Sequence, residues 1–120
     1  MPRRDRTLAD LPERERVYSR DRRKIAAFWI AARCEDRYDD DTTYWITVWD
    51  RRGRILRTHV QVHKYSHMTG VERGSPVVSL AFLDDARLEI RYAEGPPEVL
   101  PIPDEPPPIP DPAQFNPPWR

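Results

Sequence analysis

The 120-residue sequence predicts a small, mainly β protein: an antiparallel meander of about five strands, forming an open barrel or a curved sheet. The central residues carry two stretches rich in β-branched and aromatic residues, which is typical of strands. Eleven of the fourteen prolines fall between Pro96 and Pro118, where helix interiors and central strands are therefore excluded. We divide the chain into a basic arm or short helix (1–24), a β-meander domain (25–94) and an extended, acidic, proline-rich tail (95–120).

The N-terminal segment is basic and has the pattern of a helix start. Nine Lys/Arg and five Asp/Glu give it a net charge of +4. Asp10, with Glu13 three residues later, fits an N-cap followed by an acidic third position. A short helix over Leu11–Lys24 follows from this pattern. Its apolar face is thin (Val17, Tyr18), so we expect it to be ordered only by contact with another surface.

Residues 25–34 (IAAFWIAARC) are compatible with two structures. The apolar run fits a strand that is buried on both faces. The alanines, and the spacing of Ile25, Phe28, Trp29 and Ala32, fit one face of a helix. An acidic loop and a β-hairpin follow this segment and favour the strand, which is our prediction.

The first hairpin is predicted from the stretches TTYWITVWD and ILRTHVQVH, which flank residues 50–53. Gly53 is suited to the left-handed position of a three-residue turn with a bulge. Pairing Asp50 with Arg54 places Val48 opposite Leu56 on one face of the hairpin.

The opposite face of this hairpin combines aromatic and basic side chains. The same register brings together Trp45, Trp49, Arg57 and His59. Two indoles beside a guanidinium are able to stack a base, a sugar or a proline ring. The alternative is that this face is the second side of a small core and is covered by the arm or by the first strand.

A second hairpin is predicted over residues 76–94 (PVVSLAFLDDARLEIRYAE), after a long polar loop at 64–75. A turn at Asp84–Ala86 collects the large apolar residues on one face, and a one-residue slip scatters them. The predicted cross-strand pairs are Val78 with Tyr92, Leu80 with Ile90, and Phe82 with Leu88.

The sequence predicts no metal and no other cofactor. His59, His63 and His67 are spaced by four, but on a strand His59 and His63 lie ~13 Å apart at ~3.3 Å per residue, too far for one ion. The acidic residues between 35 and 41 lack the glycine and the spacing of a calcium loop. We expect a solvated loop there, or a docking site for a neighbour's arginines.

Other function classes find little support. Cys34 is the single cysteine, which excludes an internal disulfide and fits a reducing compartment. No motif frames a nucleophile, so we expect no enzymatic activity and no small-molecule substrate. A formal net charge of zero argues against nucleic acid as a partner. No run approaches the ~20 apolar residues of a membrane span, which argues against a membrane partner. No apolar run of signal-peptide type follows the Arg-rich start, so we expect a cytoplasmic protein or a component of a large complex.

Both termini carry candidate contact residues. The segment 84–120 has three Lys/Arg and eight Asp/Glu, a net charge of −5 that complements the basic arm. Apolar residues stand among the prolines of the tail; they are Val99, Leu100, Ile102, Ile109, Phe115 and Trp119. We interpret Phe115 and Trp119 as anchors for a partner rather than as residues that pack back on the chain's own core. The arm contributes Arg3, Arg4, Arg22 and Arg23.

These patterns lead to two functional hypotheses. The first is a non-enzymatic structural protein whose terminal arms bind neighbouring subunits of a larger assembly, including copies of itself. Virion structural subunits such as cement and tail-adaptor proteins share this plan, which is an analogy of architecture alone. The second is a small recognition domain that binds a peptide, a ligand or single-stranded nucleic acid on the Trp45/Trp49/Arg57/His59 face, for instance as an inhibitor of a host enzyme.

Overall fold

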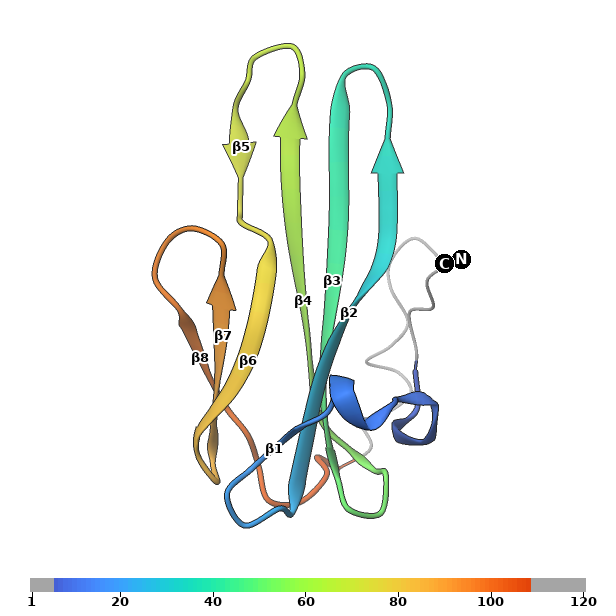
Figure 1. Ribbon diagram of the computed structural model, residues 1–120, viewed down its shortest axis with the longest axis vertical. Helices are drawn as coiled ribbons and strands as arrows, with labels where there is room; N and C mark the ends of the chain where they lie inside the picture. The colour runs from blue at the N-terminus through green and yellow to red at the C-terminus, as the bar shows by residue number, and fades with distance from the viewer. Residues whose placement is uncertain (1–5, 109–120) are drawn as a thin grey trace.

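Two antiparallel sheets make up the computed structural model, which describes residues 6–108 (Figure 1). The larger sheet has the order β1-β2-β3-β4-β5, with bounds Val17–Tyr18, Lys24–Glu35, Asp39–Asp50, Ile55–Ser66 and Glu72–Arg73. The smaller sheet has the order β6-β7-β8, with bounds Val77–Asp84, Arg87–Tyr92 and Glu98–Pro101. The predicted mainly β, antiparallel, curved architecture is confirmed. No helix in the described part of the chain is long and apolar enough to cross a membrane.

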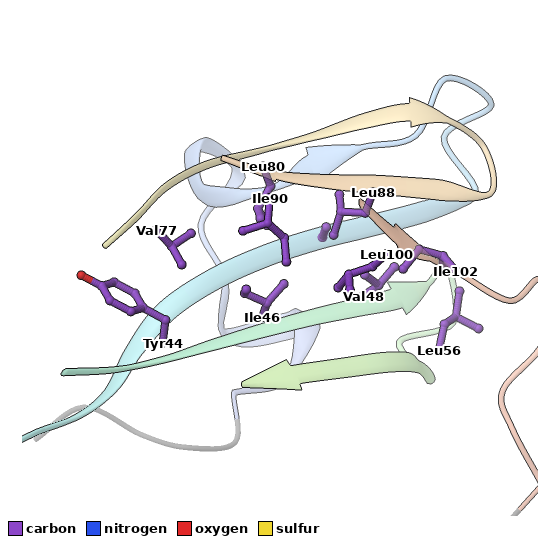
Figure 2. Packing of buried hydrophobic residues seen from close by; sticks show 11 residues of the cluster. Tyr44, Ile46, Val48, Leu56, Val77, Leu80, Leu88, Ile90, Leu100 and Ile102 are labelled. Carbon is purple, nitrogen blue, oxygen red and sulfur yellow. The ribbon is translucent and has the colours of Figure 1, made fainter. Parts of the chain in front are cut away.

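The main core lies between the two sheets. Ile46 and Val48 of the larger sheet face Leu88 and Ile90 of the smaller one (Figure 2). All four side chains are at most 1% exposed. Burial of a side chain of this size contributes roughly 1.5–3 kcal/mol, so this layer holds the two sheets together.

The predicted helix over residues 11–24 is wrong. Two short 3₁₀ turns, η1 (Leu8–Asp10) and η2 (Glu13–Glu15), precede strand β1. The Asp10 carboxylate accepts hydrogen bonds from the backbone N–H and the hydroxyl of Thr7, at 3.0 and 2.9 Å. The polar residue pair that organises the turn is therefore Thr7–Asp10, three residues earlier than Asp10–Glu13. The thin apolar face gives a longer helix little to bury.

Residues 25–34 form a strand, as predicted. They belong to β2, which pairs with β3 from Lys24↔Asp50 to Glu35↔Asp40. Ala26 and Ala27 lie on opposite faces of the strand and both are buried. Their small side chains suit a strand that is covered on both sides, so the alanines that fit a helix serve close packing here.

The first hairpin is confirmed, but its register is only partly right. Trp49 pairs with Ile55 as expected, and a bulge then places Arg57, not Leu56, opposite Val48. Leu56 is the extra residue, and it is buried in the same core as Val48. Beyond this bulge every predicted pair is displaced by one residue. An extra residue of this kind leaves no mark in an alternating apolar pattern.

The second hairpin follows the prediction more closely. Leu80 pairs with Ile90, and Phe82 pairs with Leu88. Val77, rather than Val78, pairs with Tyr92, because a register shift lies between Val77 and Ser79. Val78 is therefore exposed and Val77 is buried.

The connections are shorter than the sequence suggests. β4 continues to Ser66, and β5 begins at Glu72, so the predicted loop at 64–75 contains strand residues at both ends. The predicted acidic loop is also shorter than expected, because β3 already begins at Asp39. The long strands β2, β3 and β4 extend beyond the smaller sheet (Figure 1).

The smaller sheet gains a strand from the proline-rich region. β8 pairs with β7 from Arg87↔Pro101 to Ile90↔Glu98, beyond the predicted domain end at residue 94. Leu100 and Ile102, which the sequence places in the extended tail, are instead part of the core between the sheets, where both are 4% exposed. β8 is an edge strand, the position in a sheet where proline is tolerated.

Candidate functional site

The tryptophans of the predicted binding face lie in a second core. Trp29 and Trp49 stack with ring centroids 6.2 Å apart, and Trp49 is fully buried. Leu11, which is 3% exposed, packs with them, and Leu8 and Trp45 are partly buried at the same cluster. Trp49 is therefore a core residue that the N-terminal arm covers, which is the alternative to a binding face.

The covering segment, residues 6–16, is a strap held by polar contacts as well as by its leucines. The Arg16 guanidinium donates to the carbonyl oxygens of Leu8 and Leu11, each at 3.0 Å. The Arg6 guanidinium lies 5.8 Å from the centroid of the Trp29 ring and 3.5 Å from the Glu15 carboxylate. Part of the basic arm is thus ordered against its own domain.

Arg57 and His59 do not share a face with Trp45 and Trp49. Because of the bulge, Arg57 lies opposite Val48 and His59 lies opposite Ile46, on the side that faces the smaller sheet. The Arg57 guanidinium donates to the carbonyl oxygen of Pro101 at 2.8 Å. The predicted four-residue surface is therefore divided between the two sides of the larger sheet.

His59 adjoins a hollow of about 400 Å³ beside the smaller sheet, which we call the Glu98 hollow. The side chains that line it come from β4, from the connection between β5 and β6, and from the β7–β8 region; they are Gln61, Ser75, Tyr92, Glu94 and Glu98. The Tyr92 hydroxyl donates to Glu98 Oε1 at 2.8 Å. Burial, together with the hydrogen bond and the negative charge of Glu98, raises the pKa of the Tyr92 hydroxyl well above its ordinary value.

The sequence interpretation missed Tyr92, Glu98 and Gln61. One signal was available: Arg57, His59 and Gln61 alternate along one strand, which marks a polar stripe on one face. The contribution of Glu98 depends on the pairing of β7 with β8, which the proline content argued against.

Apolar and aromatic side chains gather where the long strands project. We call this group the distal surface: Tyr38, Tyr65, His67, Met68 and Val71. Met68 is 73% exposed, Val71 52% and Tyr38 48%. The rings of Tyr65 and His67 meet edge to face at 5.1 Å, and the His67 backbone N–H donates to the Tyr38 carbonyl oxygen at 2.6 Å. Tyr65 and Val71 line one hollow of about 400 Å³.

The opposite end of the molecule is dominated by charge. A hollow of about 650 Å³ is lined by cationic and anionic side chains, among them Arg23, Arg51, Arg52, Asp50 and Glu105. Of the predicted arm residues, Arg23 lies here, and the Arg22 guanidinium lies 4.2 Å from the centroid of the Tyr18 ring.

Each histidine contacts a carboxylate of its own. His63 Nε2 lies 2.5 Å from Glu72, and His67 Nε2 lies 2.8 Å from Asp40. Within residues 6–108 no three His, Cys, Asp or Glu side chains are grouped as metal ligands. Arg3, Arg4, Phe115 and Trp119 lie outside the described residues.

No family model, curated protein or solved structure matches this chain. The class of protein is therefore defined by its fold and surfaces: a two-sheet antiparallel β domain with a strapped aromatic face, a carboxylate-lined hollow and a projecting apolar end.

Proposed function

We propose that this chain is a non-enzymatic structural protein that binds neighbouring subunits of a larger assembly, and that the distal surface is one of its contacts. The single observation that carries the proposal is the gathering of exposed Tyr, Met and Val side chains at one end of the molecule. Scattered exposed apolar residues are ordinary, but a group of them is characteristic of protein contact sites.

The composition of this surface supports a protein partner. Tyr and Met are enriched at protein interfaces, and Met68 and Tyr38 are among the most exposed large apolar side chains of the described chain. Met is also flexible enough to fill an irregular contact. The polar side chains around them, including Asp39, Asp41 and Lys64, supply the charged margin that such interfaces have.

Copies of the same chain are the first partner to test. Net charges of +4 over residues 1–24 and −5 over residues 84–120 complement each other. Part of this complementarity is used within the chain, where Lys24 pairs with Asp104, and the remaining charges are what a second copy would meet. The virion setting, as a cement or tail-adaptor protein, is part of this proposal by analogy of architecture only.

A second candidate is a recognition domain, favoured by the Glu98 hollow rather than by the tryptophans. Because Trp49 is buried under the strap, a ligand that stacks on both Trp45 and Trp49 requires the strap to leave. The hollow beside His59, in contrast, is open to a ligand in the structure as it stands.

Sedimentation of the purified chain over a range of concentrations tests the proposal. We expect species heavier than the 14.2 kDa monomer, and we expect Met68→Asp to return them to monomer. Val78→Asp is the matched control, because Val78 is 54% exposed on β6 and lies outside the distal surface. A wild-type chain that sediments as a monomer at every concentration, or an equal effect of both variants, contradicts self-assembly through this surface.

A further inference from the structure

The Glu98 hollow is negatively charged and lacks a strong internal counter-ion. Among residues 6–108 no Lys or Arg lines it or forms an ion pair with Glu94 or Glu98. Other carboxylates of the smaller sheet pair with arginines: Glu89 lies 2.6 Å from Arg91, and Asp84 lies 2.8 Å from Arg87. The hollow is therefore suited to a cation that comes from outside the domain.

Glu98 keeps a hydrogen-bonding oxygen available. Its Oε1 atom accepts from the Tyr92 hydroxyl, whereas its Oε2 atom is 3.7 Å from His59 Nε2, which is longer than a hydrogen bond. His59 Nε2 is buried and has no hydrogen-bond partner in the described part of the chain. His59 therefore leaves the Oε2 atom of Glu98 free to accept a hydrogen bond from a donor that enters the hollow.

The side of the hollow formed by Tyr92 supplies an aromatic ring. Tyr92 is partly buried, and its hydroxyl is held in place by Glu98. A cation near an aromatic ring gains stabilisation from the ring's quadrupole, and guanidinium groups also stack on such rings.

We propose that the Glu98 hollow binds a guanidinium group, either from an arginine side chain of a protein partner or from a small free guanidinium compound. The planar group presents several N–H donors at once, which suits the carboxylates of Glu94 and Glu98 and the amide of Gln61. It is more weakly hydrated than an ammonium group, so it loses less on entering a partly buried hollow.

This site is separate from the distal surface, since the two share no residue. Failure of one proposal therefore leaves the other standing.

Titration of the ¹⁵N-labelled chain with N-acetyl-arginine amide, followed by NMR, tests the proposal. We expect saturable shifts of the Gln61 side-chain amide and of the backbone amides of Gly74 and Gly95, which line the hollow. N-acetyl-citrulline amide has nearly the same shape but no charge, and N-acetyl-lysine amide carries an ammonium group. We expect no saturable shift with the first and weaker binding with the second.

Glu98→Gln keeps an acceptor for Tyr92 but removes the charge, and we expect it to weaken arginine binding at least about fivefold. Glu89→Gln is the matched control, because Glu89 lies on the neighbouring strand and already pairs with Arg91. Equal responses to arginine and citrulline, or equal affinities of Glu98→Gln and the wild type, overturn the proposal.

Two further probes distinguish the sources of the group. Tighter binding of the arginine peptide MPRRDRTL, which is the chain's own first eight residues, than of agmatine supports an arginine side chain of a protein partner. Tighter binding of agmatine, a small free guanidinium compound, than of this peptide supports a free compound as the ligand. Failure of both to displace N-acetyl-arginine amide overturns the site.

Discussion

The Nζ atom of Lys24 lies 2.7 Å from the Oδ1 atom of Asp104, eighty residues further along the chain. Lys24 opens β2 and its side chain is 4% exposed, whereas the side chain of Asp104, which follows β8, is 89% exposed. Lys24 also donates to the carbonyl oxygen of Asp85, in the turn between β6 and β7. One buried ammonium group therefore ties the larger sheet to two segments of the smaller one.

Asp104→Ala should lower the free energy of unfolding by about 1 kcal/mol, because it leaves a buried ammonium group with fewer acceptors while water replaces part of the lost contact. Urea denaturation measures the change. Glu105→Gln is the control: Glu105 contacts Arg54 at 3.6 Å, both side chains are exposed, and we expect a change within about 0.5 kcal/mol. Equal losses in both variants argue against a special role for Lys24.

Gly74→Ala should destabilise the fold more than Gly70→Ala. Both glycines have positive φ, of 73° and 70°, so alanine costs about 1 kcal/mol of backbone strain at either position. Only at Gly74 does the added Cβ atom lie 2.5 Å from the carbonyl oxygen of Val62, which requires β4 to move. We expect at least about 1 kcal/mol of further loss there by thermal or urea unfolding. Similar losses at the two positions mean that this close approach is not important.

Leu11→Ala should loosen the strap from the tryptophans. Truncation of a buried leucine costs about 2–3 kcal/mol, and water then reaches Trp29 and Trp49, so tryptophan emission should shift to longer wavelength. Val99→Ala, at an exposed position on β8, should leave both stability and emission close to those of the wild type. Unchanged emission in Leu11→Ala contradicts the strap as the cover of this face.

Asp50→Asn should reduce the acid sensitivity of the fold. Burial alone raises the pKa of Asp50, but hydrogen bonds from the backbone and guanidinium of Arg54 and from the Arg52 N–H outweigh it, so the pKa is lowered. The unfolded chain then binds more protons than the folded one in acid. The stability that Asp50 contributes is present above about pH 4, the ordinary range of Asp, and is lost as pH falls through the lowered pKa.

Urea denaturation from pH 7 to pH 2 measures this dependence. The variant should be less stable than the wild type at neutral pH and should lose less stability on acidification. Asp21, Asp36 and Asp84 also have lowered pKa values, so a smaller slope remains in the variant. Parallel curves for variant and wild type contradict the role assigned to Asp50.

Alternation of apolar residues was enough to predict much of the fold. It predicted the pairs Leu80–Ile90 and Phe82–Leu88 because no extra residue interrupts β6 and β7 between them. It failed at Leu56 and Val78, where bulges insert a residue whose only mark is geometric. The helix prediction failed because Thr7–Asp10 and Asp10–Glu13 have the same spacing, and only tertiary contacts select between them.

The candidate surfaces were harder to predict because they depend on long-range pairing. Trp45 and Trp49 were grouped with Arg57 and His59 by a register that one bulge displaces. Glu98 meets Tyr92 only because β8 forms within a proline-rich region. The distal surface arises from Tyr65 at the end of β4 and from two turns, at 36–38 and 67–71, that the sequence presents as parts of longer loops.

Photo-crosslinking from position 68 is the most direct test of the central claim, which is that the distal surface contacts neighbouring subunits. A benzophenone amino acid at Met68 should give a covalent product of twice the 14.2 kDa chain mass, and the same residue at Leu83, exposed on β6, should not. Absence of any product from position 68 at concentrations where the chain sediments as an assembly contradicts the claim.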